Sequence, residues 1–118
     1  MDQLTRCRGL IENALKHSGN THDFIDVAEG VYKGLMQLWP LKNSVIVTEI
    51  ISHPQKKVLH IFLGAGDLNE ILSIHRDVLE FARLQGCTAI SMNGRKGWER
   101  ALKKYNIDVL HVAFWKDI

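Results

Sequence analysis

A glycine-rich turn, Gly64-Ala65-Gly66, stands between an apolar run and a helical pattern, where a backbone can bind phosphate. Glycines let an anion approach free N–H groups, and the dipole of the following helix favours negative charge. Asp67 and Glu70 follow directly, and their D-x-x-E spacing predicts a capping box that uses the same N–H groups. We therefore expect a capped helix start here, with two carboxylates where a phosphate would lie.

A basic cluster near the C-terminus is the second candidate for chemistry. Cations interleaved with aromatic side chains are typical of nucleic-acid contact, and they can equally meet an acidic protein surface. A plain solvated helix face, with Glu99 balancing part of the charge, is the third interpretation. The net charge of only +2 does not by itself point to nucleic acid. The cluster consists of Arg95, Lys96, Arg100, Lys103 and Lys104, with Trp98 and Tyr105 among them.

Histidine and serine patterns indicate neither a metal site nor a hydrolase. The six histidines form no H-x-H or H-x-x-x-H pair beside a carboxylate, so no metal is expected. Ser73 and Ser91 lack the G-x-S-x-G setting of a nucleophilic serine. His60 and His111 fall within apolar strand patterns and are interpreted as core or half-buried side chains.

Length and composition favour one globular domain. The chain has 118 residues, 46% of them hydrophobic and 24% charged, which is enough to form a core without disulfides. Cys7 and Cys87 are far apart and make no C-x-x-C pair, so we interpret both as small core residues suited to a reducing cytoplasm. No apolar run approaches a membrane span, and the polar N-terminus does not resemble a signal peptide.

The elements that must position these residues follow the order α-α-β-β-α-β-α-β, an α/β (α+β) fold with about four strands. We expect Thr21 to cap the second helix, and a close backbone approach at Gly30 and Gly34. The first two strands form an antiparallel hairpin covered by helices on both faces, and the third lies parallel to the second. The predicted helices cover 4–15, 24–35, 68–82 and 98–102, and the strands 44–51, 58–63, 88–92 and 107–115.

The order of elements over residues 43–118 resembles the core of the GNAT acyltransferases without its first strand. The stretch Ala82–Ile90 is similar to the family's A-r-x-x-G-c-x-x-l, where the central helix runs into the next strand. The stretch Arg100–Ile107 is similar to the family's last helix and strand entry. The resemblance implies a GNAT-like mixed sheet flanked by helices, in a single domain 1–118 with a helical pair over 1–40.

The resemblance also implies where acetyl-CoA chemistry would lie. The family's pyrophosphate motif, Q/R-x-x-G-x-G/A, falls on residues 65–70, where Leu68 and Glu70 replace the glycines and no cation leads the loop. The family's tyrosine acid falls on Leu102. If the chain is an acetyltransferase, Glu49 is the carboxylate placed like a general base and Tyr105 the nearest acid, and the cofactor lies at Gly64, Ala65, Gly66 and Asp67.

Two further motifs resemble small proteins encoded beside the virion-assembly genes of tailed bacteriophages. They are Leu63–Leu68 and Gly94–Leu102. This resemblance implies a non-catalytic structural, assembly or binding component of the virion, found in the host cytoplasm or in the particle, without a cofactor. One alternative is an acetyl-CoA-dependent N-acetyltransferase with a divergent cofactor loop. Another is a nucleic-acid-binding module that uses the 95–104 helix.

The last helix and last strand are the expected partner surface. Tryptophan, tyrosine and arginine most often anchor interfaces, and an open sheet edge can pair with another chain. The aromatic pair Phe114-Trp115 near the chain end indicates packing against a second subunit or a return onto its own domain. We expect a protein partner, and a homo-oligomer is a second possibility. The predicted contact residues are Arg95, Lys96, Trp98, Arg100, Lys103, Lys104 and Trp115.

Overall fold

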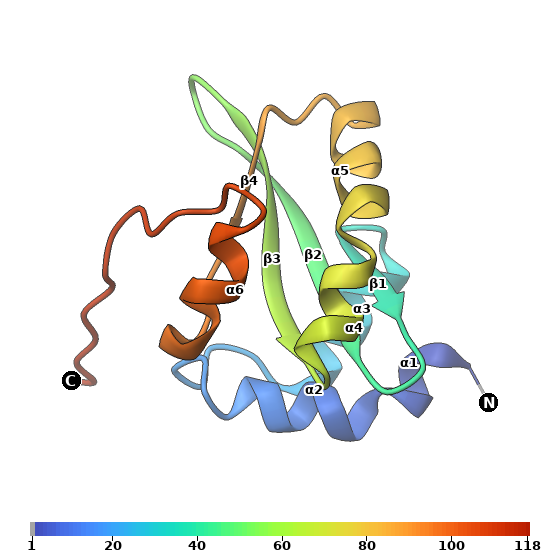
Figure 1. Cartoon of the computed structure of the whole chain (residues 1–118). Coiled ribbons are helices and arrows are strands. Elements are labelled where there is room, and N and C mark those ends of the chain that lie inside the picture. Colours follow the sequence, from blue (N-terminus) through green and yellow to red (C-terminus); the bar gives the residue numbers. More distant parts are fainter. Residues whose placement is uncertain (1) are drawn as a thin grey trace.

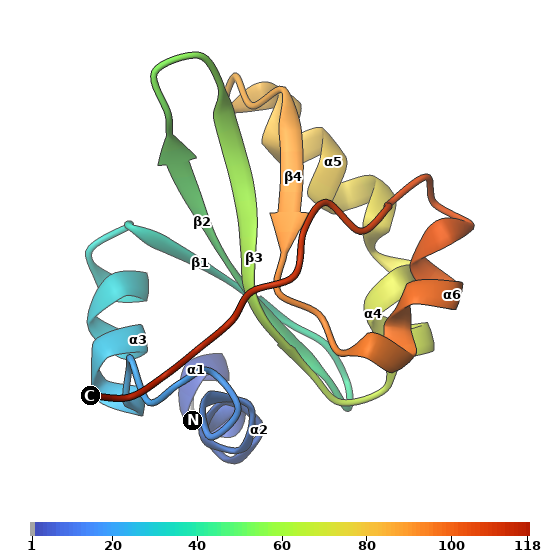
Figure 2. The same ribbon diagram turned by 90° about the vertical axis from the view of Figure 1, so that its left-hand side faces the viewer.

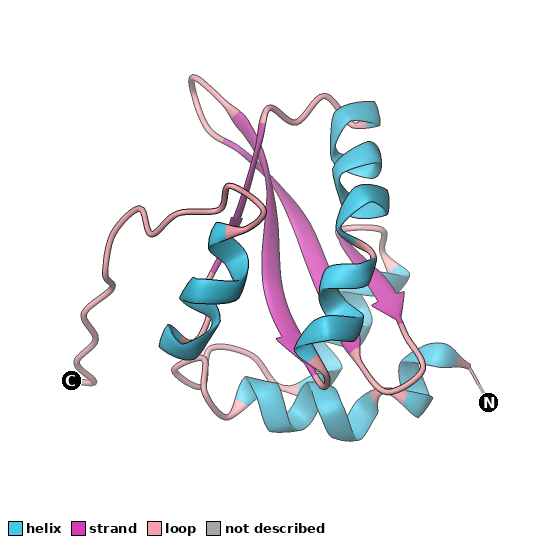
Figure 3. Ribbon diagram, viewed as in Figure 1, coloured by secondary structure: helices cyan, strands magenta, loops and turns pink. Residues whose placement is uncertain are grey.

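A four-stranded mixed sheet lies between two groups of helices (Figures 1 and 3). The computed structural model describes residues 2–118, except for the side chain of Lys96. The sheet order is β1-β2-β3-β4, with β1, β2 and β3 antiparallel and β4 parallel to β3, which confirms the predicted fold class and hairpin. The elements are α1 Gln3–Arg6, α2 Arg8–Leu15, α3 Phe24–Tyr32, β1 Met36–Pro40, β2 Val45–Ser52, β3 Lys57–Ala65, α4 Leu68–Ser73, α5 His75–Leu84, β4 Ala89–Met92, a 3-10 turn Lys96–Trp98 and α6 Glu99–Lys103.

The main core lies between the sheet and helices α1 to α3. Cys7 and Ile11 from the helices meet Val45, Val47 and Leu63 from the strands, and the first four are completely buried. Burying a side chain of this size stabilises the fold by about 1.5–3 kcal/mol. None of the helices among the described residues has the length and apolar character needed to cross a membrane.

A second core lies on the other face of the sheet, beneath α5. It contains Leu59 from β3, together with Val78, Ala82 and Cys87. Both cysteines are buried and free, as the sequence predicted for small core residues.

β3 carries a bulge that shapes the rest of the molecule. Val47 pairs with Leu63 and Thr48 with Ile61, so Phe62 is the extra residue. β4 follows β3 only as far as the pair Ile61–Met92, after which the chain turns away toward α6 (Figure 2). From Leu63 to Ala65, β3 pairs with β2 only, which leaves an opening between β3 and the chain that follows β4. This space is called the opening between β3 and β4 below.

The N-terminal part differs from the prediction at one strand. The second helix ends at Tyr32, because Gly34 adopts a positive φ of 76°, and Met36–Pro40 joins the sheet as β1. The predicted close approach at Gly30 is confirmed, since a Cβ there would meet Met36 Sδ at 2.9 Å. Asp23, not Thr21, caps α3, in a capping box with Asp26.

The predicted helices 4–15 and 68–82 are each broken once. Cys7 lies between α1 and α2 with φ −87° and ψ 0°, and Ile74 lies between α4 and α5 with φ −101° and ψ 12°.

The predicted last strand, 107–115, is wrong. Residues 107–118 form no regular element and leave the domain as an extended segment, here called the tail (Figure 1). The tail contacts the turn between α2 and α3 and does not pair with β4. The contact is made by the Trp115 ring, which lies over Gly19. The predicted count of four strands is confirmed, but one of the four was misplaced. The prediction omitted β1 and included a strand at 107–115 that does not form.

Candidate functional site

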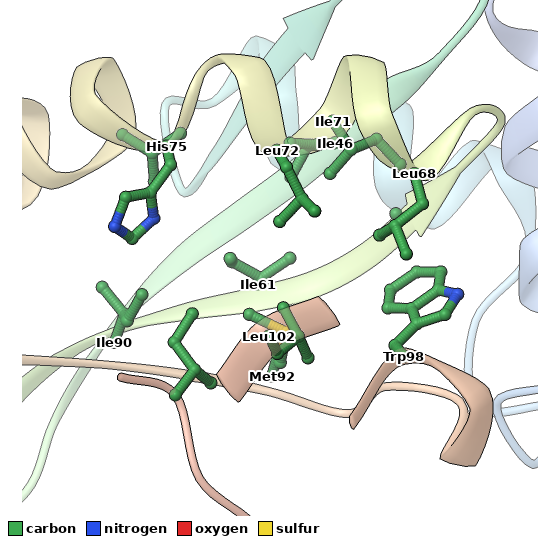
Figure 4. A pocket seen from close by; sticks show the side chains of 13 residues that line it. Ile46, Ile61, Leu68, Ile71, Leu72, His75, Ile90, Met92, Trp98 and Leu102 are labelled. Carbon is green, nitrogen blue, oxygen red and sulfur yellow. The ribbon is translucent and has the colours of Figure 1, made fainter. Parts of the chain in front are cut away.

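The opening between β3 and β4 holds a small apolar cavity (Figure 4). Strand residues Ile61 and Met92, helix residues Leu68 and Leu72, and Trp98 line it. Its volume is about 40 Å³, room for a few water molecules. Ligand pockets usually measure about 300–1,000 Å³, so this one does not accept a cofactor without opening.

Trp98 closes this opening from the side of α6 (Figure 4). A Cβ built on Gly64 would lie 3.6 Å from Trp98 Cη2 and 3.7 Å from Ile71 Cδ1. The indole therefore lies against the backbone of β3 just beyond the bulge, where β4 no longer covers the strand. The groove at the end of β3 is filled by side chains of the chain itself.

The turn from β3 into α4 is also closed. Asp67 is the N-cap of α4, as predicted, and its Oδ1 accepts from the backbone N–H of Asn69 at 2.9 Å. The predicted capping box is wrong, because the Glu70 carboxylate accepts from the N–H of Asn43 at 2.9 Å instead. The N–H of Asp67 donates to Ser44 Oγ at 2.9 Å, which fastens the turn to the start of β2.

Acetyl-CoA does not fit the residues predicted to bind it. Ala65 is buried in the core beneath α2, and Gly64 is covered by Trp98. Gly66 lies against the chain before β2, with its ideal Cβ position 2.7 Å from Ser44 Cα. Two carboxylates, Asp67 and Glu70, occupy the helix start where a pyrophosphate would need donors.

A polar row crosses the opposite face of the sheet, and sequence reasoning missed it. Glu49, His60 and Ser91 are register partners on β2, β3 and β4. His60 Nδ1 and Ser91 Oγ lie 2.8 Å apart in a hydrogen bond. Burial lowers the pKa of His60 below its usual 6.5, and the charge of Glu49 opposes this only in part. The strand register brings these residues together. They are far apart in the sequence and form no local motif that would predict the row.

The predicted base and acid of an acetyltransferase are not brought together. Glu49 shares the sheet face of Val45 and Val47, which is covered by α1 to α3. Tyr105 packs edge-on against His75 on the other face, with ring centroids 4.8 Å apart. The sheet therefore separates the two groups.

The structure also divides the predicted partner-binding residues into three places. Arg95, Arg100, Lys103 and Lys104 have exposed side chains around α6, and that of Lys96 lies outside the description. Trp98 is half-buried and lines the cavity. Trp115 lies at the far end of the tail, over Gly19.

Comparisons with known proteins find similarity at the level of structure only. No family model matches the chain, and no curated protein does. An aminoglycoside acetyltransferase from an uncultured soil metagenomic sample matches with TM-score 0.68 and 13% identity, over 100% of this chain and 93% of that one. A Trypanosoma brucei acetyltransferase matches with TM-score 0.67 and 12% identity, over 100% and 96%. A Bacillus halodurans transcriptional regulator matches with TM-score 0.71 and 10% identity, over 98% and 93%.

The chain therefore has a GNAT-like fold, the mixed α/β architecture of the acetyltransferases among these structures. Identities of 10–13% establish the fold alone.

Proposed function

We propose that this chain is a GNAT-fold binding domain that recognises an acidic protein surface and does not use acetyl-CoA. The observation that carries the proposal is the closed opening between β3 and β4, where Trp98 lies against Gly64. A cofactor would have to displace a large apolar side chain and then bind at a turn that presents carboxylates. Both steps oppose binding, because one exposes apolar surface and the other brings like charges together.

The binding surface in this proposal is the cationic side of α6. Arg95, Arg100, Lys103 and Lys104 are exposed, and none of them forms a salt bridge with a described residue. Cations that are not neutralised within their own domain attract an acidic partner and speed its encounter. The resemblance to phage virion-assembly proteins extends the proposal to a partner in a virion or its assembly, which is an expectation from family analogy.

A calorimetric titration with acetyl-CoA tests the closed opening. We expect no binding at physiological concentrations. A dissociation constant below roughly 100 μM, equivalent to more than about 5 kcal/mol, would overturn the proposal. Coenzyme A is the matched control, because it carries the same pyrophosphate without the acetyl group.

Charge reversal tests the surface, with poly-glutamate as the acidic probe. Arg100→Glu combined with Lys103→Glu is expected to weaken binding in a salt-dependent way. Lys42→Glu combined with Lys56→Glu changes the same charge on exposed residues elsewhere and is expected to leave binding unchanged. Equal binding by both double variants would overturn this surface. Tighter binding to single-stranded DNA than to poly-glutamate would favour the nucleic-acid alternative instead.

An N-acetyltransferase is the second candidate. It is favoured by the acetyltransferases among the structural neighbours and by the row Glu49, His60 and Ser91, in which a half-buried histidine pairs with a carboxylate on the next strand. A histidine with a lowered pKa is neutral at pH 7 and can accept a proton. Release of free thiol from acetyl-CoA in the presence of amine substrates, lost in His60→Gln, would establish this candidate in place of the first.

A further inference from the structure

The tail is rich in β-branched and aromatic residues, as a strand would be, but most of its side chains are exposed to solvent. Its side chains at Leu110, Val112 and Phe114 are 87%, 70% and 93% exposed. Val109 and Trp115, on the alternate side of an extended segment, are 59% and 66% exposed. Both sides of the segment are therefore in water. Monomeric proteins rarely leave so continuous an apolar segment uncovered.

β4 is an open edge of the sheet. It pairs with β3 on one side, and among residues 2–118 no backbone hydrogen bond reaches its other side. An unpaired edge presents a row of N–H and C=O groups that can accept another strand. The chain thus carries an unpaired strand edge and, separately, a β-branched and aromatic segment suited to pair with one.

The tail is held away from its own β4. The Cβ position of Gly19 lies 2.8 Å from Trp115 Cζ2, so the indole covers the turn between α2 and α3. The tail stands clear of the strands on its way to this turn (Figure 1). With Trp115 in this position, Leu110 and Phe114 remain available to another molecule.

We propose that the tail of one copy of this chain packs along β4 of a second copy, and that the second tail does the same in return. Twelve extended residues span about 40 Å, comparable with the 38 Å longest dimension of the domain, so the tail can reach a neighbour. Twofold pairing forms the same contact twice and leaves neither edge open. Residues 109–115 carry no Asp, Glu, Lys or Arg, so two copies meet there without charge repulsion. This inference does not depend on the partner proposed above.

Sedimentation velocity over a range of concentrations tests the proposal on the full chain. We expect the parent to form a dimer, and Leu110→Ser combined with Phe114→Ser to sediment as a monomer. Asp108→Ser combined with His111→Ser changes two exposed polar residues of the same segment and is expected to remain a dimer. Circular dichroism checks that all three proteins keep the same fold.

Hydrogen exchange of the β4 amides identifies the surface that the tail covers. Protection of Ala89–Met92 is expected to rise with protein concentration in the parent and in the control, and not in Leu110→Ser with Phe114→Ser. A parent that stays monomeric up to roughly 1 mM would overturn the proposal, because its dissociation constant would then be too high for a specific dimer. So would protection at β4 without dimerisation, which would show that the tail closes its own sheet. A dimer that survives the double substitution, or one that leaves β4 unprotected, would also overturn it.

Discussion

Trp98 and Trp115 lie in two regions that differ in how far they bury a tryptophan side chain. Trp98 enters the opening between β3 and β4 and packs against Gly64, Ile71 and the cavity wall. Trp115 belongs to the tail and is 66% exposed, with Gly19 as its near contact and a hydrogen bond from Nε1 to Asp117 Oδ1. The difference lies in the surroundings, because a strand bulge and a helix frame the first site and a single turn supports the second. Packing against several elements, and not residue type, decides which aromatic side chain stabilises this domain.

Replacing each tryptophan measures the difference directly. We expect Trp98→Ala to lower the free energy of unfolding by about 3 kcal/mol, since it removes apolar contacts and enlarges the cavity. Trp115→Ala should change it by less than about 1 kcal/mol in the monomer. Urea denaturation at a low protein concentration measures both. Equal losses would contradict the distinction between the two regions.

The turn at the end of β3 provides the next comparison. Gly66 has φ 113°, and a Cβ there would collide with the Asn43 carbonyl oxygen, so Gly66→Ala is expected to cost about 2 kcal/mol. Gly97, before α6, has open space around its Cβ position among the described atoms, and Gly97→Ala should stay within about 0.5 kcal/mol. Thermal unfolding measures both variants. A well-tolerated Gly66→Ala would mean that the turn is looser than described.

A third comparison concerns one hydrogen bond, from the Asn69 N–H to the Asp67 carboxylate. Asp67→Ala removes the acceptor for the Asn69 N–H and is expected to lower stability by about 0.5–2 kcal/mol. Asp108→Ala, on the exposed tail, is the matched control and should leave the denaturation midpoint unchanged. An unchanged midpoint for Asp67→Ala would show that this carboxylate is free for another role.

The smallest expected effect is in the pH dependence of stability. Burial lowers the pKa of His60 in the folded chain, so the unfolded chain binds more protons below about pH 6.5. Stability should therefore fall as the pH drops through this range, and His60→Gln should flatten that decline. Glu49 and Ser91 face His60 and are kept in the variant. His111→Gln, on the tail, serves as the control, and an equal slope in all three proteins would contradict a lowered pKa of His60 in the folded chain.

Several elements could be predicted because their signals are local. Gly86 and Asn106 end their helices with φ 82° and 61°, as their residue types indicate. Asp67 caps α4, and the apolar runs around the turn 53–56 form the hairpin of β2 and β3. Each of these features depends on residues within a few positions of one another. Their conformational preferences hold in almost any surroundings.

Other features depend on distant parts of the chain, and the sequence suggested them wrongly or not at all. The segment 36–40 forms a strand because it pairs with β2. The segment 107–115 has higher β-propensity but does not pair with the open edge of β4 in its own domain. Trp98 can lie against Gly64 because the pairing of β3 with β4 ends at Ile61 and Met92.

The sequence by itself determined the helix ends at Gly86 and Asn106, the Asp67 cap, the hairpin and the parallel crossover. Only the tertiary structure decided that Trp98 fills the opening, that Glu49, His60 and Ser91 form one row, and that the tail stays unpaired. The physical reason is the range of the interactions. Turns and caps are set by steric and hydrogen-bonding preferences of neighbouring residues, whereas strand register and burial depend on contacts between residues far apart in the chain.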